Sequence, residues 1–306
     1  MTRPLCALIA ALLLGACAAS NGSLDGSMAA YSFGDYGTAL SLLRPLAEQG
    51  NAEAQANLGV MYAQGQGITA DYAEALKWSG LAAAQGNAQA QFNLGVTHAM
   101  GWGVNQDLAQ AAKWYRLAAE QGHVDAQTNL GVLYDNGQGV SQDLAQAVKW
   151  YRLAAEKGSS RAQFNLGVMY FKGEGVAQDY AEAVRWYRMA AERGNARSHY
   201  NLGVAYALGH GVKQDYLEAA KWYRLAAARG ITTAPFRLAF IYILGQGVRQ
   251  DLVHAQMWIN LGAAAGDPEA VINREMFASL LTPQQIAEAQ KMALECERSL
   301  YKDCGQ

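Results

Sequence analysis

The sequence predicts an all-α fold made of stacked pairs of antiparallel helices. Three observations predict it: a tetrapeptide that returns every 36 residues, a glycine pair that keeps the same step, and apolar residues at helical spacing between them. Asn-Leu-Gly-Val begins at Asn57, Asn93, Asn129, Asn165 and Asn201, and Arg-Leu-Ala-Phe replaces it at Arg237. A repeat of this length indicates helical units that stack on their neighbours.

The glycine pairs are predicted to be turns. A glycine-rich loop with acidic neighbours, such as Tyr-Asp-Asn-Gly-Gln-Gly at 134–139, could also cradle a phosphate or hold calcium. A ligand loop is seldom needed six times at equal spacing, whereas a turn between stacked units is. The pairs stand at Gly65 and Gly67, Gly101 and Gly103, Gly137 and Gly139, Gly173 and Gly175, Gly209 and Gly211, and Gly245 and Gly247.

Each unit is predicted to hold two helices. Ala54, Leu58 and Tyr62 form one apolar stripe on the first helix. The second helix begins after an aspartate such as Asp71, with Glu or Gln three residues later in five units, which predicts a capping box. It ends at a glycine such as Gly86 in every unit.

Two further repeated positions are interpreted as packing residues. Gly59 lies in the middle of the first helix and is replaced by alanine only at Ala239, so the position requires a small side chain where two helices pass closely. One tryptophan recurs in the second helix of all six units, at Trp78, Trp114, Trp150, Trp186, Trp222 and Trp258.

Composition and motifs argue against nucleic acid and against catalysis. The 306 residues include 24 basic and 26 acidic side chains without a basic patch, so no nucleic-acid partner is expected. Ser299 and Lys302 match S-x-x-K, but the motifs that accompany it in penicillin-recognising enzymes are absent. We therefore expect no catalytic residue, no metal site, no cofactor and no enzymatic activity. The histidines are interpreted as scattered surface or groove residues: His98, His123, His199, His210 and His254.

The N-terminus is typical of a secretory signal. Arg3 precedes an apolar run that is too short to span a bilayer as a helix. The run ends in Leu14-Gly15-Ala16-Cys17, which looks like a bacterial lipobox and predicts acylation of Cys17, with ordinary cleavage after Ala18 as the alternative. Because Ala18 rather than aspartate follows the cysteine, we expect a lipid anchor in the outer membrane, facing the periplasm.

The repeat resembles the Sel-1-like repeat family, relatives of the tetratricopeptide repeat. The matching features are A-x-x-x-L-G-x-x-Y, then G-x-G-V, then D-x-x-x-A-x-x-W-Y-R-x-A-A-E-x-G, most clearly over 126–158. The resemblance implies a right-handed superhelical solenoid of antiparallel helix pairs. It also implies binding of other proteins or peptides, here in the bacterial cell envelope.

The predicted organisation has five parts. A lipoprotein signal peptide (1–16) precedes a lipidated N-terminus and linker (17–30), a capping partial repeat (31–50), six repeats (51–266) and C-terminal capping helices (267–306). Cys296 and Cys304 are expected to form a disulfide in that last part, because a close pair in an oxidising compartment favours a bond over a metal site. Cysteine-rich members of the family show the same spacing.

The resemblance to tetratricopeptide proteins places a binding surface on the concave side, which the first helices line. Carried onto this chain, it implies exposed aromatic residues, flanking positive charges and variable side chains as partner-binding residues. They are Phe92, Met100, Thr128, Asn136, Arg161, Phe164, Lys172, Arg197, Tyr200, Leu208, Phe236 and Leu244. Two alternatives remain open: a β-lactam-binding or hydrolysing enzyme, as ascribed to cysteine-rich relatives, and a peptidoglycan-binding module.

Overall fold

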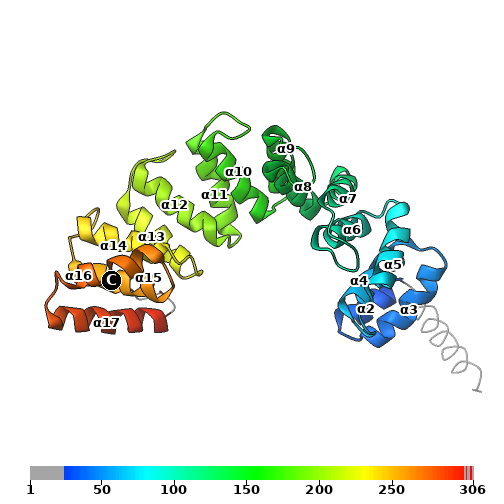
Figure 1. The fold of residues 1–306 in the computed structure, drawn as a ribbon, viewed down its shortest axis with the longest axis horizontal. Helices are drawn as coiled ribbons and strands as arrows, with labels where there is room; N and C mark the ends of the chain where they lie inside the picture. Colours follow the sequence, from blue (N-terminus) through cyan, green and yellow to red (C-terminus); the bar gives the residue numbers. More distant parts are fainter. Residues whose placement is uncertain (1–23, 300, 302–303, 305–306) are drawn as a thin grey trace, which may run out of the picture. The chain divides into compact units, whose positions relative to one another are not determined.

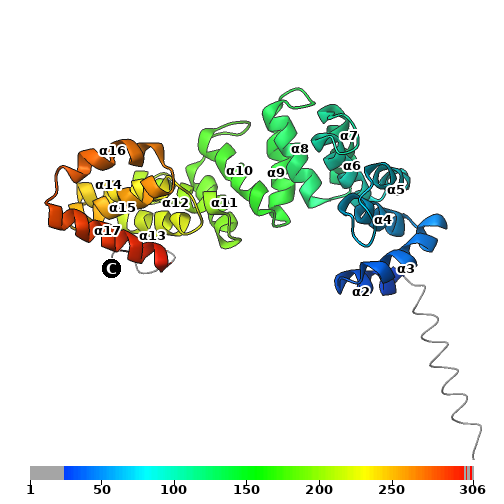
Figure 2. The same cartoon turned by 60° about the horizontal axis from the view of Figure 1, so that its bottom comes forward.

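A computed structural model describes residues 24–299, 301 and 304 of the chain. All the regular secondary structure in this part is helical, and successive helices form antiparallel pairs (Figures 1 and 2). The all-α solenoid class is thereby confirmed. The chain falls into two compact units that divide between Trp150 and Tyr151.

The helices of the repeats follow the 36-residue period. The first helices are α4 (Ala52–Gln64), α6 (Ala88–Met100), α8 (Val124–Asn136), α10 (Ser160–Lys172), α12 (Ala196–Leu208) and α14 (Ala234–Leu244). The second helices are α5 (Tyr72–Ala84), α7 (Leu108–Glu120), α9 (Leu144–Glu156), α11 (Tyr180–Glu192), α13 (Tyr216–Ala227) and α15 (Leu252–Ala264). Only α14 begins late, where Pro235 occupies its first turn and Thr233 makes no side-chain cap.

The ends are covered by four other helices. α2 (Leu24–Ser32) and α3 (Tyr36–Glu48) precede the repeats, and α16 (Pro268–Ala278) and α17 (Pro283–Arg298) follow them. α2 begins inside the segment expected to be a linker, because Leu24, Ala30 and Tyr31 pack against the first core cluster. The helical part therefore starts earlier than position 31.

The predicted aspartate caps form, but the predicted boxes are incomplete. Oδ1 of Asp71 accepts from the backbone N–H groups of Ala73 and Glu74 at 2.9 and 3.1 Å. The carboxylate of Glu74 does not return to the cap residue, because it accepts from Lys77 Nζ at 3.0 Å and from Trp78 Nε1 at 2.9 Å. Glu182 and Glu218 likewise pair with the cation three residues later. A reciprocal box forms at the start of α17, where the Thr282 side chain accepts from the backbone of Gln285 and the Gln285 side chain accepts from the backbone of Thr282.

The glycine pairs are turns, as predicted. Gly137 caps α8 in the left-handed conformation, with φ of 65°, and Gly139 follows with φ of 69°. A Cβ on Gly139 would overlap the backbone of Leu108 and Ala109, at the start of the preceding second helix. This position therefore needs glycine both for its backbone conformation and for its close approach to the preceding second helix, α7.

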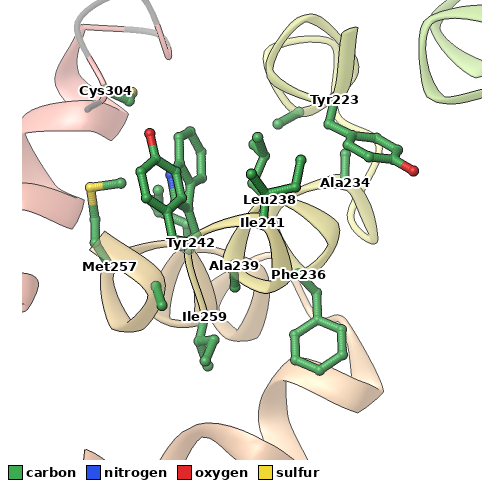
Figure 3. Packing of buried hydrophobic residues seen from close by; sticks show 14 of the residues in the cluster. Tyr223, Ala234, Phe236, Leu238, Ala239, Ile241, Tyr242, Met257, Ile259 and Cys304 are labelled. Carbon is green, nitrogen blue, oxygen red and sulfur yellow. The ribbon is translucent and has the colours of Figure 1, made fainter. Parts of the chain in front are cut away.

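The core consists of clusters shared by neighbouring helices. Trp78, Trp150, Trp186 and Trp258 are buried, and Trp114 and Trp222 are half-buried against core clusters, which confirms their packing role. The largest cluster extends from α13 into α17 and includes Cys296 and Cys304. Figure 3 shows part of this cluster, with residues of α14 and α15 interleaved.

A disulfide joins Cys296 to Cys304, as predicted. Both cysteines are buried. Tyr301, which lies between them in the sequence, stacks on Trp258 of α15 with ring centroids 6.3 Å apart. The bond therefore ties the segment after α17 back to that helix, within the core cluster that α17 shares with the last repeat. Among the described helices, none has the length and apolar character needed to cross a membrane.

Candidate functional site

The residues expected to bind a partner lie along the first helices, and ten of the twelve occupy two register positions eight residues apart. The outer position, at the helix end, is exposed in every repeat where it was predicted. Met100 is 61% exposed, Leu208 55% and Leu244 60%, and Asn136 and Lys172 are also exposed. Three of these five side chains are large and apolar, although they stand at a helix end that is exposed to solvent.

The inner position is more enclosed than the sequence indicated. Phe92 is half-buried, with its ring 4.5 Å from that of His123 and 5.8 Å from that of Tyr115. Phe164 and Tyr200 are also half-buried, against Tyr187 and Tyr223 of the same repeats.

Two of the predicted residues are buried, so the expectation of exposed side chains was wrong for them. Thr128 is 2% exposed, and its hydroxyl donates to the carbonyl of Val124 at 3.0 Å. Phe236 is 3% exposed and meets Phe240 edge to face at 5.0 Å. Phe236 belongs to the cluster that continues into the C-terminal cap (Figure 3), so apolar burial there outweighs exposure to a groove.

The predicted positive charges lie at the surface of the second unit. Arg161, Lys172 and Arg197 are exposed. Lys172 Nζ lies 3.4 Å from a carboxylate oxygen of Glu174, which offsets part of its charge.

Two hollows open beside these residues, one in each unit. A cavity of about 290 Å³ lies in the first unit and includes Phe92 in its wall. A second hollow of about 470 Å³ lies in the other unit and is lined by Tyr200, Leu208 and Arg237, among others. There Arg237 Nε donates to the hydroxyl of Tyr200 at 3.2 Å. Each hollow combines an apolar wall with a few polar groups, as ligand pockets do.

The histidines show no shared site. His199 is 3% exposed, so its interpretation as a surface or groove residue was wrong. It occupies the position where four other repeats have a buried glutamine, its Nδ1 lies 2.9 Å from the carbonyl of Asn195, and burial lowers its pKa from 6.5. No group of three or more histidine, cysteine, aspartate or glutamate side chains suited to a metal ion occurs within the described residues.

The S-x-x-K match has a structural explanation on its serine side. The hydroxyl of Ser299 donates to the carbonyl of Cys296 at 2.9 Å, at the end of α17. The same carbonyl in the last turn also accepts from the backbone N–H of Tyr301 at 3.0 Å, so the Ser299 hydroxyl takes part in ending the helix. Lys302 and Cys17 lie outside the described residues.

Sequence reasoning missed a ladder of buried glutamines that joins successive repeats. Gln55 Nε2 donates to the carbonyl of Ala47 at 3.0 Å, and Gln163 Nε2 does so to Ala155 at 3.0 Å. Gln91 and Gln127 make the same bond eight residues back along the chain. The signal was present, because glutamine recurs at this register in four repeats, but the partner is a backbone atom that no motif displays.

The fold and this surface define a helical repeat scaffold. Comparison with known proteins shows which family of repeat proteins it belongs to. The Sel1 repeat model matches residues 52–87, 88–123, 124–159, 160–195, 196–231 and 234–267. The chain therefore belongs to the Sel1 repeat family. No match was found among curated proteins.

Two solved structures are similar in sequence as well as fold. One is c5321, described as a protective antigen present in uropathogenic Escherichia coli strains and displaying an SLR fold. It is 38% identical with a TM-score of 0.75, and the match covers 85% of this chain and 58% of that one. This chain thus spans little more than half the length of that relative. The other is a Sel1 repeat protein from Oxalobacter formigenes, 36% identical with a TM-score of 0.68, over 77% of this chain and 94% of that one.

Proposed function

We propose that this protein is an extracytoplasmic, lipid-anchored scaffold that binds other envelope proteins or peptides through the first helices of its repeats. The proposal assigns it no catalytic residue, metal or cofactor. The observation that carries it is the recurrence of Met100, Leu208 and Leu244, three large apolar side chains that are 55–61% exposed at one register position. Exposed apolar side chains that recur in this way favour an interaction surface over a merely solvated one.

The partner-binding surface is proposed to comprise the predicted residues that reach solvent. In the first unit these are Phe92, Met100 and Asn136, and in the second they are Arg161, Phe164, Lys172, Arg197, Tyr200, Leu208 and Leu244. The hollows beside Phe92 and Tyr200 would receive side chains of the partner. Arg161 and Arg197 suit a partner with acidic groups nearby.

The location in the cell envelope has separate support. The Cys296–Cys304 bond is typical of proteins that face an oxidising compartment. The sequence Leu14-Gly15-Ala16-Cys17 supports acylation of Cys17. Cys17→Ser is expected to move the protein from the membrane fraction to the soluble periplasmic fraction, as followed by immunoblotting of fractionated cells. Unchanged membrane attachment of that variant would contradict the anchor.

The binding proposal is tested with exposed leucines on the two kinds of helix. Leu208→Gln with Leu244→Gln removes apolar area from first helices, and Leu217→Gln with Leu225→Gln does the same on α13, where these leucines are 50% and 41% exposed. Both double variants should keep the melting temperature, because surface changes rarely cost much. Capture of envelope proteins, quantified by mass spectrometry, should fall at least tenfold for the first variant only.

Equal capture by both double variants would contradict the proposal. The same purified protein should be assayed for hydrolysis of a chromogenic cephalosporin and for co-sedimentation with isolated peptidoglycan. Hydrolysis would favour the enzyme alternative, and co-sedimentation that survives the Leu208 and Leu244 changes would favour the glycan-binding alternative.

A further inference from the structure

One tyrosine recurs in the second helix and fills the space over the glycine of the first helix. Tyr115, Tyr187 and Tyr223 are 1–4% exposed. A Cβ added to the matching glycine, Gly95 in the repeat of Tyr115, would lie 2.5 Å from the tyrosine ring, and the other two repeats give 2.6 Å. The aromatic ring is thus part of the packing of a complete helix pair.

The first repeat lacks this ring. Ser79 occupies the tyrosine position, directly after Trp78, just as Tyr115 follows Trp114. The helices are still close, since a Cβ on Gly59 would lie 2.5 Å from the Ser79 hydroxyl oxygen. Because serine ends where the ring would begin, the helices leave space that the remaining side chains do not fill.

That space is the cavity of about 290 Å³ in the first unit. Gly59 and Ser79 are in its wall, together with the apolar side chains of Leu76, Phe92 and Val96. The rings of Tyr72 and Trp102 also line it, stacked on each other with centroids 6.4 Å apart, and they are 42% and 46% exposed. An aromatic side chain from outside could therefore enter past these two rings.

One residue in the wall of the cavity has a buried donor without a partner. In the fifth repeat the side chain of Asn201 lies beside the hydroxyl of Tyr187, fourteen residues earlier in the chain, and counteracts the rise that burial causes in the pKa of that tyrosine. Asn93 lies at the same distance after Ser79 and lines the cavity. Its Oδ1 accepts from Gln89 Nε2 at 2.9 Å, but its Nδ2 is buried without a hydrogen-bond partner. A buried donor without a partner is costly, which favours a ligand that can accept from it.

We infer that the cavity at Ser79 receives a tyrosine side chain of the partner, whose ring takes the place of the missing internal ring and whose hydroxyl oxygen accepts a hydrogen bond from Asn93 Nδ2. This inference rests on the proposed protein-binding function and identifies the chemistry of one anchor. Tyrosine supplies a large apolar area with a polar end, the combination that often dominates the energy of an interface. Phenylalanine would fill the cavity but leave Asn93 without its acceptor.

The test uses the full chain and N-acetyl-L-tyrosinamide as the probe, with saturation-transfer NMR as the readout. Saturation of the protein methyl groups should reach the ring protons of the probe. The matching phenylalanine amide should bind about fivefold more weakly, because it forgoes one hydrogen bond to a buried donor. Phenol alone should also bind more weakly, since it lacks the backbone that approaches the rim.

Three variants make the test specific. Ser79→Tyr restores the internal ring, so it should raise the melting temperature and weaken probe binding at least tenfold. Gly80→Ala is the matched control on the same helix, where an added Cβ meets no atom within 4 Å, and binding should be unchanged. Asn93→Ala should make the tyrosine and phenylalanine amides bind equally, a result that does not depend on the folding of Ser79→Tyr.

Several results would overturn the inference: no saturation transfer to the tyrosine probe, equal binding of the two amides by the unaltered protein, or probe binding that Ser79→Tyr leaves intact. Phenol that binds as well as the blocked tyrosine would exclude a peptide side chain as the occupant. If the probe fails to bind while capture still depends on Leu208 and Leu244, the inference is wrong and the proposed function stands. If the probe binds but capture shows no such dependence, the proposed function is wrong.

Discussion

Arg152 Nη2 donates a hydrogen bond of 2.6 Å to the hydroxyl of Tyr170, which joins α9 to the next helix, α10. The same pair, with the arginine 18 residues before the tyrosine, occurs at Arg116 and Tyr134 and at Arg188 and Tyr206. The tyrosine that the sequence placed in an apolar stripe therefore also fastens its repeat to the preceding one through its hydroxyl.

Removing this hydroxyl should have a small effect. Tyr170→Phe keeps the ring and deletes one hydrogen bond on the exposed side of the pair, so the free energy of unfolding should fall by about 0.5–1 kcal/mol. Urea denaturation followed by circular dichroism measures it. A loss above about 2 kcal/mol would mean that this contact, and not the core, holds the two helices together.

Replacing the buried glutamine Gln163 should lower the free energy of unfolding more than removing the Tyr170 hydroxyl does. Gln163 is 0% exposed and its Nε2 donates to the carbonyl of Ala155, so Gln163→Ala both breaks the bond and leaves space. We expect a loss of about 2–3 kcal/mol in the same urea experiment. Gln178→Ala is the matched control, because its exposed side chain donates to the carbonyl of Phe171 at 2.9 Å and should cost about 0.5 kcal/mol. Equal losses in the two variants would show that burial of the Gln163 side chain does not increase its contribution to stability.

His123 should make stability depend on pH. Its Nδ1 accepts from the backbone N–H of Ala126 at 3.2 Å as the cap of α8, and burial lowers its pKa from 6.5 despite the opposing charge of Asp125. Because the folded state disfavours the protonated ring, the stabilisation is complete above about pH 6.5 and is lost as the pH falls from there through the lowered pKa.

Asparagine can replace His123 as the cap, because Asn87, at the same position one repeat earlier, accepts from the backbone N–H of Ala90 at 2.9 Å. His123→Asn should therefore keep the cap and reduce the drop in melting temperature between about pH 7.5 and about pH 5. Calorimetry at the two pH values measures the difference. Parallel pH profiles of the two proteins would show that the His123 cap does not titrate in this range.

The disulfide should stabilise the C-terminal cap selectively. Closing the short loop between Cys296 and Cys304 is worth about 2.5 kcal/mol on the chain-entropy estimate. Replacing both cysteines with alanine should speed amide hydrogen exchange in α17 and in α15, whose Trp258 stacks on Tyr301 between the two cysteines, and leave α4 and α5 unchanged. Uniform exchange rates in the two proteins would show that the cap does not depend on the bond.

The fold could be predicted from the sequence because its signals are local and repeated. Gly137 and Gly139 need left-handed backbone wherever the chain turns, and Asp71 caps a helix with its own side chain. These requirements act within a few residues, so six copies of the same pattern define the period and the helix pairs.

The surface could be predicted only in part because exposure depends on neighbouring helices. Thr128 shares its register with Phe92, yet it is small enough to be covered, and Phe236 is enclosed by a cap that is not a repeat. Glu74 bonds to Lys77 and Trp78 although its spacing from Asp71 suits a capping box. The cavity at Ser79 was not predicted: serine replaces tyrosine there in the sequence, but only the packing shows that no other side chain fills the space.

Binding of partners along the first helices can be tested directly by site-specific photo-cross-linking in living cells. A photoreactive amino acid would be placed at the exposed first-helix positions Met100, Lys172 and Leu208, and, as controls, at the exposed second-helix positions Lys113, Lys149 and Lys221. We expect one partner species to be cross-linked from at least two of the first-helix positions and from none of the controls. The same species cross-linked from the second-helix positions, with none from the first helices, would contradict it.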